Sequence, residues 1–512
     1  MIKNKFHNNL ELSYHKFCWY FTIAMFVGCN LINIDKFVPW FILNDKLKIL
    51  GLLAFFFIAW ALFLIFFLLI CHRKTTKFFS VLLCILSTIV VYFVAKYDIA
   101  VDRTMIMNAI YTDQTEVYSL LSWQMLPFLF FVTLVPIFLI IKIKIIYPPK
   151  YLLKSLKIIV ILIIAVILVG YLQYQNLHRA GNLSHKKIIY SVIPLNYIRS
   201  SFSAVNHSLI KPTLSQRKKN IEITGKVTKT ENLIVVLAIG ETSRQKNFSL
   251  YGYERLTNPL LSKQKNLHIL NGKARLGSTL YALPEILVKN DIPLTALTHK
   301  LQIPTACYVN YTLHDNCQIP GEIKVTKCQR KNCFDDDTIP YLQQHLIEYK
   351  SGLSLAVIHI GGGSHGPSYH ERYPDEFKIF KPICQDADVV NQCSRDQIYN
   401  TFDNTILFVD YVVDKMIKIL DQSKHRYVFI YLSDHGESLL EGGRIFHGTP
   451  PGIPLPVEQS QIPLLIKASF PITIKNFSEY PQPYVYDTIV DLLNIETSNH
   501  DKDNSFINKN SK

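Results

Sequence analysis

The chain has 512 residues, of which 49% are hydrophobic and 12% aromatic, and it carries a formal net charge of +15. This composition is apolar for a soluble protein of this length, and the apolar residues are concentrated in the first third of the chain. The composition therefore excludes a single soluble domain and favours a membrane protein.

Five long apolar runs predict a transmembrane domain over residues 1–171. Most of them reach the roughly 20 residues that a helix needs to cross a bilayer, and a cleaved signal peptide would explain one run at most. The first run is shorter but continues into the apolar stretch "FVPWFIL". The predicted spans are residues 17–32, 49–70, 78–95, 125–146 and 158–172.

Basic residues in the short connections predict the orientation of these spans. They gather before the first span at Lys3, Lys5 and Lys16, after the second in "HRKTTK", and after the fourth in "KIKIIYPPKYLLK". The positive-inside rule makes these segments cytoplasmic. With five spans, the chain after about Tyr171 lies in the periplasm of a Gram-negative cell. This compartment excludes nucleic acid as a partner, and the positive charge suits anionic lipid head groups.

The segment before the fourth span, "MIMNAIYTDQTEV", carries polar residues at a spacing of four. On a helix, Asn108, Thr112 and Glu116 share one face. Taken alone, this pattern is also that of an ordinary solvated loop.

The composition changes twice after the membrane domain. Residues 172–230 are basic and poorly periodic, which predicts a connector with an amphipathic helix on the lipid surface, broken at Pro194. Residues 231–497 form the predicted periplasmic catalytic domain. The polar tail, residues 498–512, is predicted to be disordered.

Three apolar, β-branched runs in the outer domain end in glycine and ionisable residues. They are "NLIVVLAIGET", "SLAVIHIGGGSHGP" and "YVFIYLSDHGE", with helical patterns between them, such as residues 397–420. Continuous apolar runs are typical of strands covered on both faces, as in a parallel α/β sheet. Ligands gather at the carboxyl ends of such strands, where Glu241, His365, Asp434 and His435 are found.

Asp434, His435 and His447 admit two interpretations. They are either a strand end with a capped loop or part of a metal site, because each costs several kcal/mol, roughly, to bury unpaired. A hydroxyl for a nucleophile is offered by Ser278 and Thr279 just before a probable helix, whose N-terminus stabilises an anion. Thr279 alone is also an ordinary N-cap, and Thr242 and Ser243 beside Glu241 are rivals on residue type.

Six cysteines fall in the outer domain, which predicts disulfides because their number is even and the periplasm is oxidising. Structural zinc is the competing interpretation, but the cysteines lack paired C-x-x-C knuckles. They are Cys307, Cys317, Cys328, Cys333, Cys384 and Cys393.

Several longer stretches together resemble the phosphoethanolamine transferases of Gram-negative inner membranes. This family includes lipid A modifying enzymes and the mobile colistin-resistance transferases. The resemblance runs from "DIAVDRTMIMNAIYTDQTEV" to "VEQSQIPLLI". Its strongest pieces are "GETSR", "SLYGYERLTNP", "SHGPSYHERYP", "CSRDQIYNTFDNTILFVDYVV" and "SDHGESLLEGG" followed by "FHGTP".

The resemblance implies an alkaline-phosphatase/sulfatase-like α/β domain with Zn²⁺ at its strand ends. Matching positions make Glu241, Thr279, Asp434 and His435 the zinc ligands, with Thr279 also the nucleophile. His365 and His447 match family histidines that bind the substrate phosphate or a further zinc. Such ligands suit Zn²⁺, and a hydroxyl at the metal is a competent nucleophile.

The resemblance also bears on the cysteines and on the lipid donor. Cys328–Cys333 and Cys384–Cys393 match family disulfides, which leaves Cys307 and Cys317 as a further pair. At Arg275 and Glu285 the family has a disulfide that brackets the nucleophile loop, and an ion pair replaces it here. Asn108, Thr112 and Glu116 match residues that receive the ethanolamine head group.

The expected activity is transfer of phosphoethanolamine from phosphatidylethanolamine to lipid A, or to another lipopolysaccharide or glycan acceptor, by a monomeric enzyme. The transfer runs through a covalent phospho-threonine and lowers susceptibility to cationic peptides such as polymyxin. One alternative is a phosphoglycerol transferase or a phosphatase/sulfatase-type hydrolase on the same fold. The other is a catalytically dead membrane scaffold.

Overall fold

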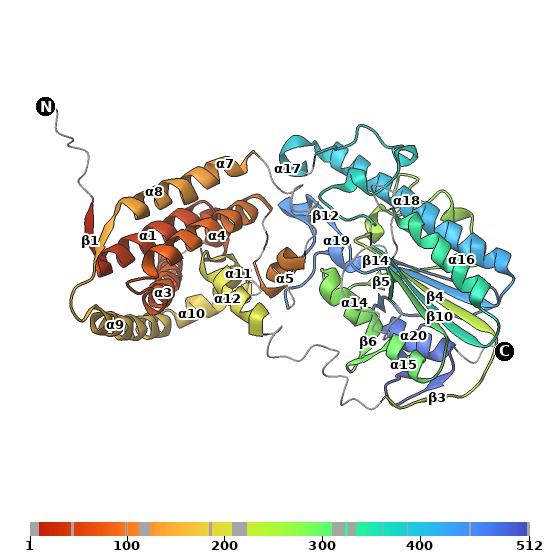
Figure 1. Ribbon diagram of the computed structural model, residues 1–512. Coiled ribbons are helices and arrows are strands. Elements are labelled where there is room, and N and C mark those ends of the chain that lie inside the picture. Colours follow the sequence, from red (N-terminus) through yellow and green to blue (C-terminus); the bar gives the residue numbers. More distant parts are fainter. Residues whose placement is uncertain are drawn as a thin grey trace. The chain divides into compact units, whose positions relative to one another are not determined.

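The structure is a computed structural model that divides into two compact units, with the boundary after residue 207 (Figure 1). Each unit is described by itself. The residues described are 10–41, 46–97, 99, 101–111, 123–183, 187–206, 223–309, 323–325, 334–361, 363–386, 388–449 and 452–508.

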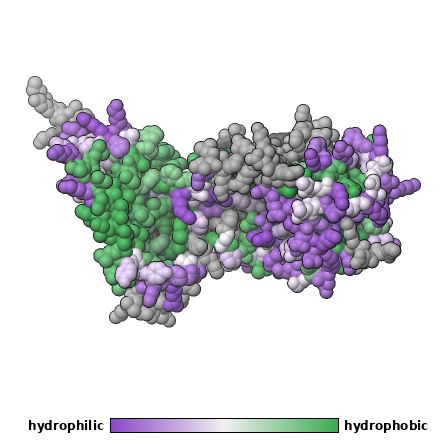
Figure 2. Space-filling model, turned by 90° about the horizontal axis from the view of Figure 1, so that it is seen from below, coloured by the Kyte–Doolittle hydropathy of each residue, from purple (hydrophilic) through white to green (hydrophobic). Residues whose placement is uncertain are grey.

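The N-terminal unit is a helical bundle. Its helices are α1 (Tyr14–Leu31), α2 (Ile34–Phe41), α3 (Lys46–Ile70), α4 (Thr76–Tyr97), α5 (Arg103–Tyr111), α7 (Met125–Phe128), α8 (Val135–Lys142), α9 (Tyr151–Leu172), α10 (Tyr174–Leu183), α11 (Lys187–Ser191) and α12 (Leu195–Val205). A π-helical segment, Leu129–Leu134, joins α7 to α8. Figure 2 shows hydrophobic residues covering the middle of this unit and hydrophilic residues gathered at its ends, as expected of a bundle that spans a membrane.

Four helical segments of the described chain are long and apolar enough to cross a membrane: Ile49–Ile70, Thr76–Tyr97, Met125–Lys142 and Tyr151–Leu172. The predicted first span falls short of this standard. It folds as α1, which has 18 residues, followed after a short turn by the separate helix α2. Polar residues such as His15, Lys16 and Asn30 lower its hydropathy. The prediction of five spans is therefore confirmed for four of them.

The first part of the predicted connector belongs to the helical bundle. The Asn30 side chain donates to the Ile193 carbonyl oxygen at 2.6 Å and accepts from the Ile193 N–H at 3.0 Å. The hydroxyls of Tyr197 and Ser87 lie 3.1 Å apart. The predicted break at Pro194 is confirmed, because α11 ends and α12 begins on either side of it. One face of α12 thus packs on the bundle.

The C-terminal unit is built on an eight-stranded sheet in the order β15-β5-β14-β11-β4-β10-β8-β9. Its central strands β11, β4, β10 and β8 are parallel, as predicted, whereas β14 runs antiparallel to β11 and β5. The strands of the sheet are β4 (Leu233–Gly240), β5 (Leu267–Lys273), β8 (Thr305–Val309), β9 (Ile323–Val325), β10 (Leu353–Ile360), β11 (Tyr427–Ser433), β14 (Gln461–Ala468) and β15 (Tyr480–Pro481). Beside the sheet, β12 (Ser438–Leu439) and β13 (Ile445–Phe446) form a hairpin.

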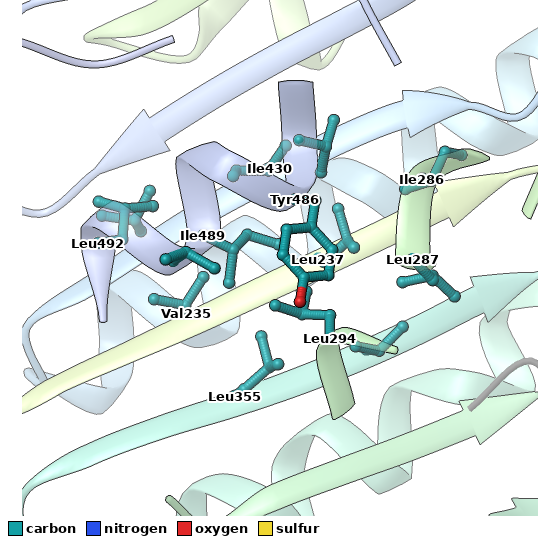
Figure 3. Packing of buried hydrophobic residues seen from close by; sticks show 14 of the residues in the cluster. Val235, Leu237, Ile286, Leu287, Leu294, Leu355, Ile430, Tyr486, Ile489 and Leu492 are labelled. Atoms are coloured by element: carbon teal, nitrogen blue, oxygen red, sulfur yellow. The ribbon is translucent and has the colours of Figure 1, made fainter. Parts of the chain in front are cut away.

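Helices cover both faces of this sheet (Figure 1). They include α14 (Thr279–Leu287), α15 (Leu294–Lys300), α16 (Ile339–Glu348), α18 (Arg395–Ser423) and α20 (Tyr484–Leu492). Every residue of β4, β10 and β11 is buried, which explains their continuous apolar runs. Figure 3 shows Val235 and Leu237 of β4 packed against Tyr486 and Ile489 of α20.

Acidic residues of α18 anchor the segment that follows β4. Asp403 accepts hydrogen bonds from Asn247 at 2.5 Å and from Tyr253 and Arg255 at 2.9 Å each. About two helical turns further along α18, Asp410 accepts hydrogen bonds from the backbone N–H groups of Leu260 and Leu261 at 2.8 and 3.0 Å. The stretch "SLYGYERLTNP" is therefore tied to a single long helix.

The predicted disorder of the tail is wrong as far as Asn508. Phe506 is fully buried in the core beside α20, and Ile507 forms a β-bridge with Ile474. These two apolar residues and polar contacts such as those of Asn499 with Lys289 and Tyr486 hold the stretch, which a compositional argument misses.

We expect the attachment of residues 247–264 to α18 to weaken as the pH rises. Burial raises the pKa of Asp410 to about 7, although the two backbone N–H groups act to lower it. In the unfolded chain this carboxyl ionises near ~3.9. The stability contributed by its protonated form is complete below that value and is lost as the pH rises through the folded-state value of about 7.

Hydrogen exchange of peptides from residues 247–264, corrected for intrinsic rates, measures this effect. Relative to Asp410→Asn, which does not titrate, the wild-type segment should lose protection between pH 4.5 and pH 8. Thr257→Ala removes a neutral contact of the same segment, so its difference from wild type should not vary with pH. A constant difference between wild type and Asp410→Asn would contradict the argument.

Candidate functional site

The site begins at the carboxyl ends of two neighbouring parallel strands. Glu241 follows β4, and Asp434 and His435 follow β11. Backbone N–H groups fix Asp434, because its Oδ1 accepts from Thr242 at 3.0 Å and from His435 at 2.7 Å. The three side chains are 0 to 1% exposed. They are thus held together out of water by the sheet itself.

The loop after β10 closes over Glu241. The Ser364 N–H donates to the Glu241 carbonyl oxygen at 2.9 Å, and Gly363 has a φ of +37°. A Cβ atom on Gly363 would lie 2.3 Å from that same oxygen. Only glycine allows this approach, since any side chain would push the loop off the strand.

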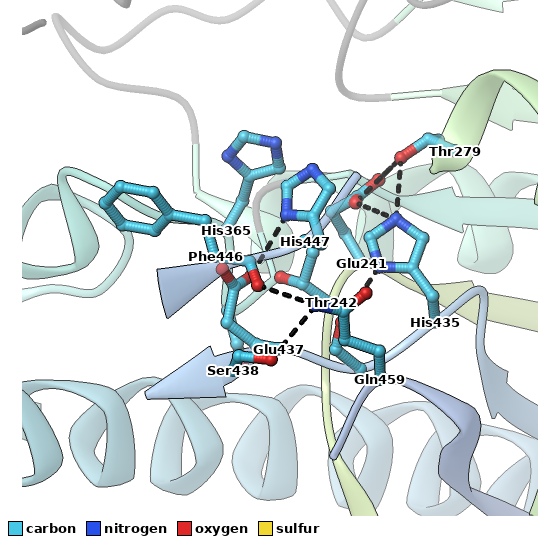
Figure 4. Close-up of polar contacts among 12 residues, drawn as sticks. Glu241, Thr242, Thr279, His365, His435, Glu437, Ser438, Phe446, His447 and Gln459 are labelled. Carbon is cyan, nitrogen blue, oxygen red and sulfur yellow. Dashed lines mark hydrogen bonds and ion pairs between the residues drawn. The ribbon is translucent and has the colours of Figure 1, made fainter. Parts of the chain in front are cut away.

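Thr279 approaches this cluster from the start of α14. Its Oγ1 donates to the two carboxylate oxygens of Glu241 at 2.9 and 3.0 Å and lies 3.3 Å from Nε2 of His435 (Figure 4). Ser278 precedes it as the N-cap residue. Thr279 is therefore the first residue of the helix, and its hydroxyl points to the strand ends.

The rival hydroxyls are placed differently. The Ser243 Oγ lies 3.3 Å from Ser364 Oγ. Thr242 has a φ of +51°, and its buried Oγ1 has no hydrogen-bond partner in the described part of the chain. Geometry thus favours Thr279 among the hydroxyls that residue type alone left open.

Two further histidines lie beside the cluster. The ring of His447, just after β13, is 4.6 Å from the ring of His435 and 4.8 Å from that of His365, measured between centroids. Nδ1 of His447 lies 3.2 Å from Oε2 of Glu437 (Figure 4). His365 and His447 therefore lie next to His435 at the strand ends.

Burial and neighbouring charges set the protonation of these groups. Burial raises the pKa of Glu241 well above its usual range and also raises that of Asp434. Burial lowers the pKa values of His435 and His365 well below theirs, so both rings are neutral. At His447 burial acts in the same direction, but the carboxylate of Glu437 outweighs it and raises the pKa to about 9.

The cluster fits a divalent cation. One ligand atom from each of Glu241, Asp434 and His435 can be chosen so that all lie within 4.8 Å of one another. Oδ2 of Asp434 is buried and accepts no hydrogen bond from the residues that the structure describes, although His435 Nε2 lies 3.3 Å away. A cation would satisfy this oxygen and would offset two carboxylate charges.

Two site residues were missed by the sequence analysis. Glu437 lies inside the quoted "SDHGESLL" stretch, three residues after Asp434, and its contact with His447 depends on the hairpin that folds back. His359 of β10 has Nε2 at 3.6 Å from Glu241 Oε2, and neither of its ring nitrogens is hydrogen-bonded to a described residue. A histidine in an otherwise apolar strand was the available signal.

Other predicted residues are only partly described. Asn108 lies on α5, whereas Thr112 and Glu116 lie outside the described residues. The Cys384–Cys393 disulfide is confirmed, with its sulfurs 2.04 Å apart, and Cys307 is also disulfide-bonded. Cys317, Cys328 and Cys333 fall outside the described residues.

The predicted ion pair next to the nucleophile helix is present. Nη1 of Arg275 lies 3.4 Å from Oε2 of Glu285, with the two side chains 63% and 30% exposed. An exposed pair of this kind contributes about 0 to 1 kcal/mol to stability.

Comparisons with known proteins agree with this architecture. Residues 59–209 match the family described as phosphoethanolamine transferase EptA/EptB, and residues 298–495 match the sulfatase family. The integral membrane lipooligosaccharide phosphoethanolamine transferase A of Neisseria meningitidis has a similar fold, with a TM-score of 0.82 and 21% identity. That match covers 97% of this chain and 99% of the other.

Relatives of known name cover most of the chain. Phosphatidylethanolamine transferase Mcr-1 of Escherichia coli is 27% identical over 86% of this chain and 87% of its own. Phosphoethanolamine transferase EptA of Escherichia coli K12 is 31% identical over 81% of this chain and 78% of its own. With this identity over such a length, the chain belongs to the phosphoethanolamine transferase family.

Proposed function

We propose that this protein transfers phosphoethanolamine from phosphatidylethanolamine to a lipid A phosphate, or to another lipopolysaccharide or glycan acceptor. The observation that carries the proposal is the contact of Thr279 Oγ1 with both Glu241 and His435. A hydroxyl held by candidate metal ligands at a helix N-terminus is suited to attack phosphorus. The names of its relatives supply the transferred group, the lipid donor and the glycolipid acceptor.

The proposed cofactor is Zn²⁺, held by Glu241, Asp434, His435 and Thr279. Carboxylate, imidazole and hydroxyl ligands are those that zinc accepts in catalytic sites. When bound, the ion would act as a Lewis acid that lowers the pKa of the Thr279 hydroxyl and stabilises negative charge on the phosphoryl group.

In the first proposed step, Oγ1 of Thr279 passes its proton to the Glu241 carboxylate, to which it donates a hydrogen bond, and attacks the phosphorus of phosphatidylethanolamine. An Oγ1–P bond forms and the bond to the diacylglycerol oxygen breaks, while His447, protonated because of Glu437, can deliver a proton to that leaving oxygen. In the second step an acceptor oxygen attacks the same phosphorus, and Thr279 leaves with the proton held by Glu241. His447 regains its proton from the acceptor hydroxyl or, where the acceptor is an ionised phosphate, from water, which regenerates the enzyme.

The remaining proposed roles concern the lipid. Asn108, Thr112 and Glu116 would bind the head group, since a carboxylate attracts the ethanolamine ammonium. For the catalytic unit to lie in the periplasm, α1 must supply a fifth crossing of the inner membrane. Its 18 residues span about 27 Å at 1.5 Å per residue, close to the thickness of the hydrocarbon core.

We expect purified full-length protein to retain at least one zinc ion per chain. Asp434→Ala should lower the zinc affinity by at least about tenfold, because one charged ligand is lost. Asp414→Ala is the matched control, because Asp414 is a buried carboxylate of α18 that pairs with Lys418 and bonds Gln264, and it should retain wild-type zinc. Metal analysis after dialysis measures both, and equally low zinc in wild type and Asp434→Ala would reject the site.

Two substitutions should separate bond breaking from donor recognition. Thr279→Ala should abolish the covalent phosphoethanolamine adduct, lipid transfer and cleavage of a small soluble phosphodiester, because the attacking oxygen is gone. Glu116→Ala should abolish transfer from phosphatidylethanolamine but leave zinc binding and slow cleavage of the soluble compound. If Thr279→Ala still forms the adduct, then Thr242, Ser243 or Ser278 is the nucleophile. If Glu116→Ala transfers normally, its proposed role is wrong.

Mass spectrometry of lipid A from a host that expresses the protein tests the acceptor. Wild type should add one phosphoethanolamine and lower polymyxin susceptibility, and Thr279→Ala should do neither. Cleavage of phosphatidylethanolamine without any modified glycolipid would instead support the hydrolase.

A further inference from the structure

Arg244 is an arginine with a fully buried side chain, three residues after Glu241. Burying a guanidinium is costly unless its charge is paired and its N–H groups are bonded, so a fully buried arginine requires an explanation. The sequence analysis assigned no role to it, and within the described part of the chain its guanidinium bonds none of the candidate metal ligands.

The guanidinium of Arg244 joins two parts of the chain. On its own segment, Nε donates to Oδ1 of Asn247 at 2.6 Å. Across the fold, Nη1 donates to the backbone carbonyl of Glu437 at 3.1 Å and to Oε1 of Glu441 at 2.7 Å. Cζ of Arg244 lies 5.4 Å from the ring centres of Tyr399 and Phe402.

Further hydrogen bonds hold the carboxylate of Glu441 in place. It also accepts the Tyr399 hydroxyl at 2.8 Å and the Leu439 N–H at 2.6 Å. Burial acts to raise the pKa of Glu441, but the Arg244 charge and these bonds outweigh it and lower that pKa to about 2. The pair is therefore ionised at any working pH.

Glu437 and Glu441, the two residues that Arg244 bonds across the fold, lie at the hairpin of β12 and β13. Glu437 directly precedes this hairpin and His447 directly follows it, and the two residues form the carboxylate–imidazole contact beside the metal cluster (Figure 4). Its backbone is strained, because Leu440 and Phe446 have φ values of +72° and +64°. Strained backbone of this kind persists only where surrounding contacts hold it.

We propose that Arg244 is a positioning residue for the transfer reaction. It connects the end of β4, which carries Glu241, to the hairpin that presents Glu437 and His447, and so it fixes His447 relative to the nucleophile. This inference rests on the proposed function. It adds that the distance between the metal cluster and His447 is set by an ion pair outside the cluster.

The test uses four full-length variants in the same transfer assay as wild type. Arg244→Met removes the charge and the hydrogen bonds, and Arg244→Lys keeps the charge but cannot bond Asn247, Glu437 and Glu441 together. Glu441→Gln removes the partner charge, and Arg244→Met/Glu441→Gln closes a double-mutant cycle. The matched control is Lys467→Met, because Lys467 is also a buried cation that pairs with a carboxylate, Asp421 of α18, at 2.9 Å.

We expect Arg244→Met to lower kcat by about 10- to 100-fold with little change in KM or zinc content, as for other residues that orient a site from outside. Arg244→Lys should recover part of kcat. The double variant should be no slower than Arg244→Met alone, since both changes break one link. Lys467→Met should lower thermal stability but keep kcat.

Different failures have different meanings. Inactive wild-type protein that holds zinc would reject the proposed function itself. Wild-type kcat in folded Arg244→Lys and Glu441→Gln would overturn this inference, and these two milder variants decide the matter if Arg244→Met does not fold. An equal loss of kcat in Lys467→Met, or a loss that follows zinc content, would show a general structural effect and would also overturn it.

Discussion

Two carboxylates buried side by side are the constraint on which the rest of this structure depends. Glu241 and Asp434 end neighbouring parallel strands, and water does not reach them. Each ionised carboxylate in such a place costs several kcal/mol, roughly, after relaxation. Backbone N–H groups at Asp434 and the hydroxyl of Thr279 offset part of that cost. A bound cation would offset the remaining cost. This cost arises from the topology of the sheet, which places the two carboxylates side by side.

Much of the candidate site followed from the sequence because it depends on short-range pattern. An apolar run that ends in glycine and an ionisable residue predicts both a buried strand and a polar edge. Parallel pairing then brings β4, β10 and β11 together at one edge. For this reason Glu241, Asp434 and His435 were found without knowledge of the fold.

The features that were missed depend on long-range contacts. Arg244 and Glu441 are nearly two hundred residues apart, and no local pattern distinguishes a buried arginine from an exposed one. Glu437 gains its role only because the hairpin returns to place His447 beside it. The first span is not among the four long apolar segments, because polar residues such as His15 and Asn30 interrupt the apolar sequence of α1. The burial of Phe506 was missed because the composition of the tail is polar, and it is seen only in the packing of the core.

The link between Arg275 and Glu285 bears on how the protein is made. An ion pair forms as soon as its two residues meet, whereas a disulfide must wait for an oxidant. The Cys384–Cys393 disulfide lies before α18 rather than at α14. The link next to the helix that carries Thr279 therefore needs no thiol oxidase to form. Ionic strength, not the redox state of the host compartment, acts on this link.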